Sequence, residues 1–218
     1  MSPDVASADA IDNGLVDEVV TILGSGKEAD VYLGRWKGAD LVLKVYRLHR
    51  TPHKKKAMIG YAMDRVGLIA ANEFTVLQKA YRAGVPVPTP ARRVDNMFTM
   101  RYLGGESKAT LLKDVVIDEP EIVAKEAVML VEKLLDTCIV HGDLSEYNIL
   151  YWNGRLFAID FPQAIDFSSN VTRHILIEEA KPLLLRDLKN LQYFFKRLDV
   201  ELDAENEYNR LCKKLESN

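Results

Sequence analysis

The residues best suited to chemistry lie in the segment His-Gly-Asp-Leu-Ser-Glu-Tyr-Asn-Ile-Leu at residues 141–150. Asp143 is followed five positions later by Asn148, and apolar CIV and ILY runs flank the segment. At this spacing an aspartate can orient or deprotonate an attacking hydroxyl while an asparagine amide oxygen holds a magnesium ion. Asp160 ends a short apolar strand about a dozen residues later, where a second magnesium ligand is expected. Taken alone, Asp160 could simply end a strand in a turn, but in order with the catalytic loop and the three upstream features described next it predicts phosphoryl transfer.

A glycine-containing turn upstream supplies the features expected of a phosphate-binding loop. It is formed by Gly24, Ser25, Gly26 and Lys27 between two strand-like segments. Glycine allows backbone N–H groups to approach phosphate oxygens closely, and Val31 in the next strand could cover a nucleobase. The turn is not a Walker A loop, since no Gly-Lys-Ser/Thr sequence opens a helix here. Glycine-rich hairpins are common, so this turn gains its weight from the residues around it.

Lys44 lies inside an otherwise apolar strand, LVLKVY. Such a lysine could extend its amine to water from an edge strand, or it could reach the α- and β-phosphates of a nucleotide. The second role needs a carboxylate on the following helix. Glu73, which lies among mainly apolar helical residues, is the best candidate, although a lone glutamate there could equally be solvated. We expect an ion pair between Lys44 and Glu73.

These residues require a β-rich first half and a helical second half. Residues 19–45 predict three strands separated by GSG and KGAD turns, and residues 66–83 predict a helix that ends at Gly84. Two strand-like segments, ARRVD and MFTMRYL, follow, and Gly104 and Gly105 mark a hinge. Further helices are expected at residues 121–137, 183–198 and 204–215, with short strands at NILYW and LFAID. We expect a mobile or weakly ordered tail at 1–14, one lobe at 15–103 and a second at 104–218.

Composition restricts the class of protein. The 218 residues are 48% hydrophobic and carry a net charge of −3, which disfavours a nonspecific nucleic-acid binder. No run approaches the roughly 18 apolar residues of a membrane span, and residues 1–14 do not resemble a secretory signal. Cys138 and Cys212 are too few for a disulfide framework or a metal cluster. We expect a cytoplasmic protein.

The motifs GKEADVY, NEFTVLQKAYRAGVPVPTP, HGDLSEYNIL and IDFPQA resemble those of the RIO family of atypical serine/threonine protein kinases. The resemblance covers residues 15–198 and implies an α+β, two-lobed protein-kinase-like fold that uses ATP and Mg²⁺. It further implies maturation of the small ribosomal subunit as the role, with a pre-small-ribosomal-subunit particle as partner. The first and second RIO types each share motifs with this chain, so the type is open. We expect the protein to be a catalytic core without the winged-helix domain that the second RIO type carries.

Carried over by residue, the resemblance makes Asp143 the catalytic aspartate and Asp160 a transient phosphoryl acceptor as well as a metal ligand beside Asn148. Lys44 and Glu73 become the phosphate-binding ion pair. The adenine pocket would be formed by Met100 at its back, Arg101 and Leu103 at the hinge, and Leu150 beneath the base. Gly142 stands in place of the arginine of the HRD motif, and Pro162 in place of the glycine of DFG.

Two other functions fit the motifs less well: a small-molecule kinase of the aminoglycoside or choline phosphotransferase type, and a pseudokinase scaffold that binds nucleotide without turnover. The basic residues Arg47, Arg50 and Lys54 to Lys56 form a predicted loop at 47–56. This loop is either a solvated surface or a contact with ribosomal RNA.

Five further residues have an expected structural role. We expect His141 to support the catalytic-loop backbone rather than to bind metal. Asp187 is expected either to cap its helix or to brace the loop. Tyr193, Phe194 and Phe195 are expected in the core.

Overall fold

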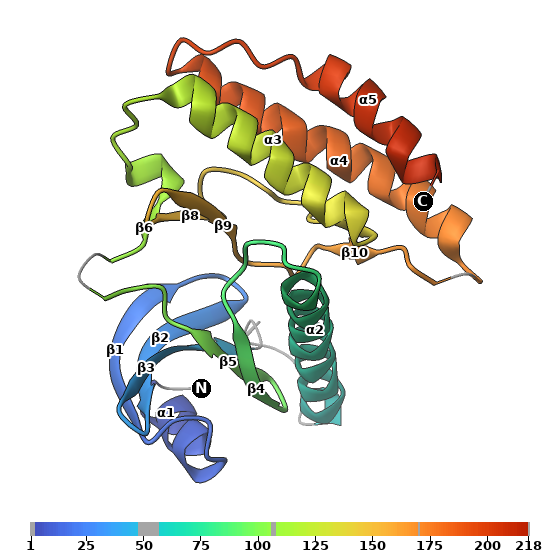
Figure 1. Ribbon diagram of the computed structural model, residues 1–218. Coiled ribbons are helices and arrows are strands. Elements are labelled where there is room, and N and C mark those ends of the chain that lie inside the picture. Colours follow the sequence, from blue (N-terminus) through green and yellow to red (C-terminus); the bar gives the residue numbers. More distant parts are fainter. Residues whose placement is uncertain (1–2, 48–56, 106–107, 170, 218) are drawn as a thin grey trace. The chain divides into compact units, whose positions relative to one another are not determined.

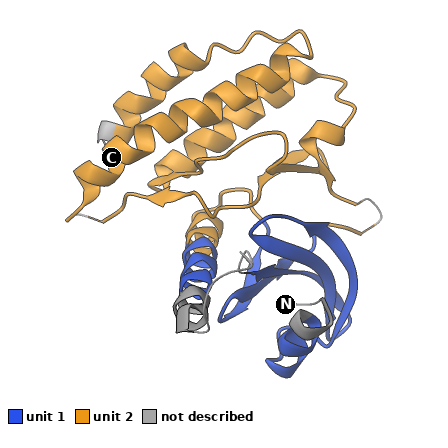
Figure 2. Cartoon of the chain, turned by 180° about the vertical axis from the view of Figure 1, so that it is seen from behind, with its two compact units in different colours: residues 1–75, 88–102 blue, residues 76–87, 103–218 orange. Residues whose placement is uncertain are grey.

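The structure is a computed structural model of the 218-residue chain, and it describes residues 3–47, 57–105, 108–169 and 171–217 (Figure 1). The chain forms two compact units (Figure 2). Unit 1 comprises Met1–Thr75 and Pro88–Tyr102, and unit 2 comprises Val76–Val87 and Leu103–Asn218. Within the described residues, no helix is both long and apolar enough to cross a membrane.

Unit 1 is built on an antiparallel sheet with the strand order β1-β2-β3-β5-β4. The strands are β1 (Glu18–Ser25), β2 (Ala29–Trp36), β3 (Ala39–Tyr46), β4 (Pro90–Val94) and β5 (Met97–Arg101). Lys37 and Gly38 form the two-residue turn between β2 and β3, and both have positive φ angles (49° and 80°). That conformation matches the right-handed twist of paired strands. The three strands predicted over residues 19–45 are thereby confirmed.

The first fourteen residues differ from the expected weakly ordered tail, because α1 (Pro3–Asp12) is a helix. Ala10 at its end is fully buried and shares a hydrophobic cluster with Leu15, Val16 and Leu43. The segment is rich in alanine, the strongest helix former. Its short apolar face lacks the periodicity by which amphipathic helices are recognised, so the sequence pattern did not indicate it.

The helix α2 (Ala57–Arg82) begins earlier than the predicted residue 66 and contributes to both units. Its last turns and the segment that follows belong to unit 2, which differs from the predicted boundary at residue 103. Two contacts account for this. The Ala158 backbone N–H donates to the Pro86 carbonyl at 3.0 Å, and Lys79 Nζ lies 2.5 Å from Asp166 Oδ1.

Unit 2 is mainly helical, with α3 (Pro120–Asp136), α4 (Arg173–Lys196), α5 (Ala204–Ser217) and a short 3-10 helix at Leu112–Asp114. Two small sheets accompany the helices. One pairs β6 (Thr110–Leu111), β8 (Ile149–Trp152) and β9 (Arg155–Ala158), and the other pairs β7 (Ile139–Val140) with β10 (Ile165–Asp166). Cys138 and Cys212 are free and half-buried.

Helix α4 begins at Arg173, well before the predicted residue 183. Pro182, which directly precedes the predicted start, lies inside the helix. A proline removes one backbone hydrogen bond and crowds the preceding turn. The buried residues Ile177, Ala180 and Leu184 hold the helix together on both sides of it.

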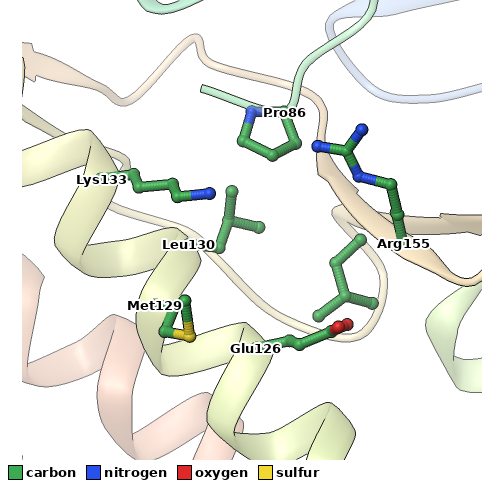
Figure 3. A pocket seen from close by; sticks show the side chains of 7 residues that line it. Pro86, Glu126, Met129, Leu130, Lys133 and Arg155 are labelled. Carbon is green, nitrogen blue, oxygen red and sulfur yellow. The ribbon is translucent and has the colours of Figure 1, made fainter. Parts of the chain in front are cut away.

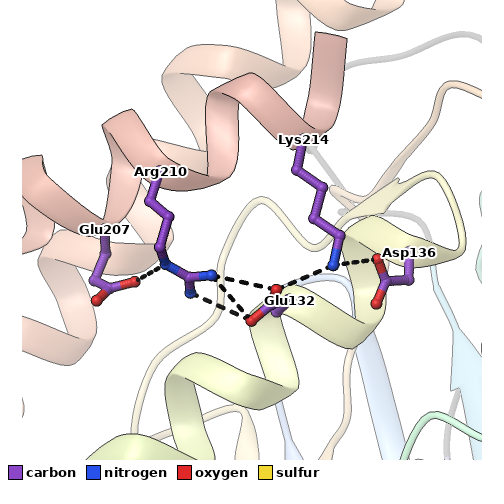
Figure 4. A network of polar contacts seen from close by, with 5 residues as sticks. All are labelled: Glu132, Asp136, Glu207, Arg210 and Lys214. Carbon is purple, nitrogen blue, oxygen red and sulfur yellow. Dashed lines mark hydrogen bonds and ion pairs between the residues drawn. The ribbon is translucent and has the colours of Figure 1, made fainter. Parts of the chain in front are cut away.

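An ionic network connects helix α5 to α3 (Figure 4), and α5 also carries buried leucines. Leu211 and Leu215 are fully buried. Glu132 of α3 accepts hydrogen bonds from Arg210 at 3.2 Å and from Lys214 at 3.0 Å. The Arg210 hydrogen bond is the main reason that the pKa of Glu132 is lowered.

Candidate active site

The glycine-containing turn of unit 1 is held by a network that sequence reasoning missed. Ser25 Oγ donates to Asp30 Oδ1 at 2.6 Å, and Asp30 forms an ion pair with Arg47 at 3.0 Å. Arg47 also donates to Ser25 Oγ at 3.0 Å, and the Gly26 N–H donates to the Ala29 carbonyl at 2.9 Å. Asp30 is buried. The turn is thus fixed from β2 and from the residue after β3, while Gly24, Gly26 and Lys27 are exposed and Val31 is half-buried.

The predicted ion pair of Lys44 and Glu73 is present. Lys44 Nζ lies 2.8 Å from Glu73 Oε1 and 2.9 Å from Oε2, and only 6% of Lys44 and 2% of Glu73 is exposed. A buried pair in such bidentate contact holds the ammonium in a fixed position, because neither charge can be solvated elsewhere.

Tyr46 completes this buried cluster. Its hydroxyl donates a short hydrogen bond to Glu73 Oε2, and the Lys44 ammonium lies 5.0 Å from its ring centroid. Tyr46 is itself buried. The sequence signal was available, because Lys44 and Tyr46 are two positions apart and so share one face of β3, and a buried tyrosine hydroxyl usually has a partner.

The catalytic loop of unit 2 brings Asp143 and Asn148 together. Asn148 Nδ2 donates to the Asp143 carbonyl at 2.8 Å and to Asp143 Oδ2 at 3.2 Å. The amide nitrogen is therefore turned toward the aspartate, and the amide oxygen is directed to the other side, where a cation can be bound.

His141 and Asp187 support this loop from beneath. The Asp143 N–H donates to His141 Nδ1 at 3.3 Å, and His141 Nε2 lies 3.0 Å from the Ile159 carbonyl oxygen. This arrangement requires the ring proton on Nε2 and uses both nitrogens, so the expected structural role of His141 is confirmed. Asp187 accepts the Gly142 N–H at 2.8 Å and the Leu144 N–H at 2.7 Å. Of its two expected roles, Asp187 therefore braces the loop.

The environment of Asp187 alters its titration. The side chain is almost fully buried, and burial raises the pKa of Asp187 to about 7 despite the two N–H donors, which act in the opposite direction. Gly142, whose N–H it accepts, has φ +82°, and an added Cβ would lie 2.8 Å from the Gln163 carbonyl oxygen. Glycine at this position is therefore a steric requirement of the loop.

Asp160 has a left-handed backbone, with φ 69°. The preceding residue, Ile159, donates its N–H to the Asn148 carbonyl at 3.0 Å, which joins the Asp160 segment to the catalytic loop. Phe161 is buried with its ring centroid 4.6 Å from that of His141. The backbone thus connects the positions of Asn148 and Asp160 directly.

The donor set of these residues fits magnesium. Asn148 and Asp160 provide an amide and a carboxylate oxygen, the hard ligands that Mg²⁺ prefers. In the described part of the chain, no three His, Cys, Asp or Glu side chains form a metal-binding group. A magnesium ion here would take its other ligands from phosphate and water, as is usual for this metal in kinases.

The residues predicted for adenine belong to different units. Met100 is half-buried on β5 and Arg101 is exposed at its end, both in unit 1, while Leu103 and Leu150 belong to unit 2. The Arg101 N–H donates to the Thr89 carbonyl at 2.8 Å and is therefore already satisfied. The adenine roles of these residues stay predictions.

The prediction for the three aromatic residues of α4 has a mixed outcome. Phe194 and Phe195 are core residues, but Tyr193 is 67% exposed, which corrects its prediction. Successive residues of a helix point in different directions, so Tyr193 is exposed while Phe194 and Phe195 are buried. The Arg197 guanidinium lies 5.3 Å from its ring. The basic loop at 47–56 lies outside the described residues except for Arg47.

A strand lysine paired with a helix glutamate, and an Asp–Asn catalytic loop joined to a second aspartate, define an α+β protein of the kinase fold. A family model, the RIO domain, matches residues 30–208. The chain belongs to the RIO family of serine/threonine-protein kinases, which are phosphotransferases.

Individual relatives agree with this assignment. The chain is 30% identical to the RIO-type serine/threonine-protein kinase Rio1 of Haloferax volcanii, over 91% of this chain and 70% of that protein. It is 29% identical to RIO2 of Caenorhabditis elegans, over 88% of this chain and 36% of that protein. The two types are thus matched at similar identity, and the chain spans less than half of the matched eukaryotic relatives.

Solved structures show the same fold. The Rio2 kinase of Chaetomium thermophilum, crystallised as an ADP/Mg²⁺-phosphoaspartate complex, superposes with a TM-score of 0.69 at 22% identity. The superposition covers 99% of this chain and 70% of that one.

Proposed function

We propose that this protein is an ATP- and Mg²⁺-dependent serine/threonine kinase and ATPase that acts in the cytoplasm on a pre-small-ribosomal-subunit particle. The observation that carries the phosphotransfer part is the hydrogen bonding of Asn148 to Asp143, with the backbone link from Asn148 to Ile159. These contacts fix the positions of the Asp143 carboxylate, the Asn148 amide oxygen and the Asp160 segment relative to one another. The ribosomal part is an extension from the family.

Each residue has a defined task in this proposal. The N–H groups of the Gly24–Gly26 turn and the Lys44 ammonium bind phosphate oxygens, and Glu73 keeps that ammonium charged and aimed. Asp143 accepts the proton of the attacking hydroxyl, a role for which its contact with Asn148 Nδ2 fixes the carboxylate. Magnesium, held by Asn148 and Asp160, would neutralise charge on the phosphates.

We also propose that Asp160 itself accepts the phosphoryl group. The γ-phosphorus–oxygen bond of ATP breaks, a carboxylate oxygen of Asp160 forms the new bond, and ADP leaves. Water then hydrolyses the acyl phosphate and regenerates the carboxylate. Support comes from the phosphoaspartate reported for the Chaetomium Rio2 kinase.

The test compares ATP turnover by the wild type, Asp143→Asn and Asp160→Asn, with and without Mg²⁺. Asp118→Asn, at an exposed position, is the matched control. We expect Asp143→Asn to lose turnover by about 10²-fold or more, as removal of a general base does, Asp160→Asn to lose it at least as far because acceptor and metal ligand are removed together, and the control to keep it. A hydroxylamine-sensitive phosphoprotein should form in the wild type and be absent from Asp160→Asn.

Two outcomes would contradict the proposal. ATP binding with no Mg²⁺-dependent turnover in the wild type would favour a pseudokinase scaffold. Turnover with no acyl phosphate under rapid acid quench would remove the covalent step alone.

The RNA contact is proposed for the basic residues of segment 47–56, because phosphate neutralisation needs clustered lysine and arginine. Replacement of Lys54, Lys55 and Lys56 by glutamine should weaken binding to small-subunit RNA and reduce its salt dependence. Unchanged binding would show that the segment is a solvated loop.

A further inference from the structure

A groove of about 860 Å³ opens on unit 2, between the first half of α3 and the residues from the end of α4 into α5. The apolar part of its lining, termed the floor, consists of Ala124, Val128, Met129, Val200 and Leu202. Ala124 and Val200 are buried, whereas Met129 is 52% exposed. None of the lining residues belongs to the catalytic loop or to the Lys44–Glu73 pair.

The charged side chains that line the groove, termed the rim, are mostly acidic. They are the carboxylates of Glu121, Asp199, Glu201, Asp203 and Glu207 and one ammonium group, that of Lys125. Five negative charges and one positive leave a local charge of −4, more negative than the −3 of the entire chain. Asp203 is used to cap α5 and Glu207 pairs with Arg210. Glu121, Asp199 and Glu201 are exposed and have no ion-pair partner in the described part of the chain.

A second feature beside the groove is a pair of exposed apolar side chains on α3. Ile122 and Met129 are seven positions apart on α3, which places them on one face of the helix, and they are 49% and 52% exposed. Met129 also lines a smaller neighbouring hollow of about 100 Å³, beside Leu130 and Pro86 and near Glu126 (Figure 3). A flexible methionine between two hollows can adapt to the shape of a partner, and neighbouring exposed apolar side chains are typical of interaction sites.

We propose that this groove docks a basic segment of a partner protein, one that carries at least two Lys or Arg residues around an aliphatic or aromatic side chain. The apolar floor would bury that side chain and provide affinity, and the carboxylate rim would select positive charge. Nucleic acids and anionic membranes are disfavoured occupants, because their phosphates would meet the unpaired carboxylates of Glu121, Asp199 and Glu201.

The test uses a fluorescein-labelled peptide with lysines and leucines at helical spacing, and a second peptide with glutamate in place of lysine. Fluorescence anisotropy measures binding to the full chain at low and high salt. Glu121→Lys combined with Glu201→Lys reverses two rim charges. Asp12→Lys combined with Glu179→Lys makes the same charge change at exposed positions elsewhere. We expect the rim variant to weaken binding of the basic peptide by about tenfold or more, and the control to change it little.

Met129→Glu separates docking from simple attraction between charges. If total charge alone governed binding, the added carboxylate would strengthen it; if the apolar floor takes part, binding weakens. Equal weakening by the rim and control variants, or tighter binding by Met129→Glu, would overturn the proposal. A wild-type dimer that Met129→Glu converts to monomer in sedimentation would assign the groove to a second copy instead, and would overturn it too.

Discussion

Tyr46→Phe should loosen the Lys44–Glu73 pair without breaking it. The substitution keeps the buried ring and removes only the hydroxyl that donates to Glu73 Oε2. A hydrogen bond to a charged group contributes about 1.5–3 kcal/mol to stability. Since Oε2 retains the Lys44 ammonium at 2.9 Å, the carboxylate is not left without a donor, and the lower end of the range applies. For a chain of this size, about 1.5 kcal/mol corresponds to a fall in Tm of roughly 3–6 °C.

Activity should fall as well, because Glu73 would hold the lysine less firmly. If most of that free energy is also lost from the transition state, kcat/KM for ATP should fall about tenfold. Glu73→Gln is a harsher change, because it leaves a buried ammonium without its counter-charge, at a cost of about 3–5 kcal/mol.

The assay combines thermal unfolding with ATP turnover, and Tyr32→Phe is the matched control. Tyr32 is buried in the same sheet, and its hydroxyl has no hydrogen-bond partner among the residues the structure describes. Equal Tm values and equal turnover for the two variants would refute the assignment of Tyr46 as a positioning residue. A fall in Tm with unchanged kcat/KM would reduce Tyr46 to a purely structural role.

The remaining predictions concern unit 2. The Asp187 carboxyl, with its pKa raised from 3.8 to about 7, stays protonated in the folded state over a range where the unfolded chain has released the proton. Its contribution to the free energy of unfolding therefore decreases as pH rises from about 4 to about 7. Asp187→Asn should abolish this pH dependence, measured by denaturant titrations across the range, while weakening the loop. Gly142→Ala should destabilise by more than about 2 kcal/mol, from the left-handed backbone and the Cβ contact with the Gln163 carbonyl, and reduce turnover with it; a wild-type melting curve would contradict this. Arg210→Ala should lower the free energy of unfolding by less than about 1 kcal/mol, and by nothing in high salt, because the Arg210–Glu132 pair is partly exposed. Leu211→Ala should lower it by about 2–5 kcal/mol at any salt concentration.

The sequence predicts best where chemistry fixes residue type and spacing together. Lys44 and Glu73 were paired from one strand and the following helix, and the structure confirms the contact. The strands of unit 1 were equally clear, since turn residues separate alternating β-branched runs. Asp187 was recognised as important, but its task depends on a hydrogen bond to Gly142, 45 positions away, which no local pattern encodes.

The errors have local physical causes. Helix α4 was predicted too short, since it begins at Arg173 and continues through Pro182, whose cost the buried neighbours on both sides outweigh. Tyr46 was treated as part of an apolar strand because its ring is apolar, although its place on the same face of β3 as Lys44 could have indicated the contact with Glu73. Asp30 lies at the start of β2 and Arg47 follows the end of β3. Their ion pair beside the glycine-containing turn depends on the register between the two strands, which the sequence alone did not give.

The left-handed backbone at Asp160 limits which residues evolution can place there. An L-residue with a Cβ loses roughly 1–2 kcal/mol at such φ values, and only glycine, asparagine and aspartate adopt them routinely. The backbone therefore favours these three residue types before any chemistry is considered, and aspartate is the one among them that carries a carboxylate. Glutamate keeps the charge but not the conformation, and asparagine keeps the conformation but not the charge. A relative with asparagine at this position would be expected to fold normally and be catalytically silent, whereas one with glutamate would need a compensating change in the loop.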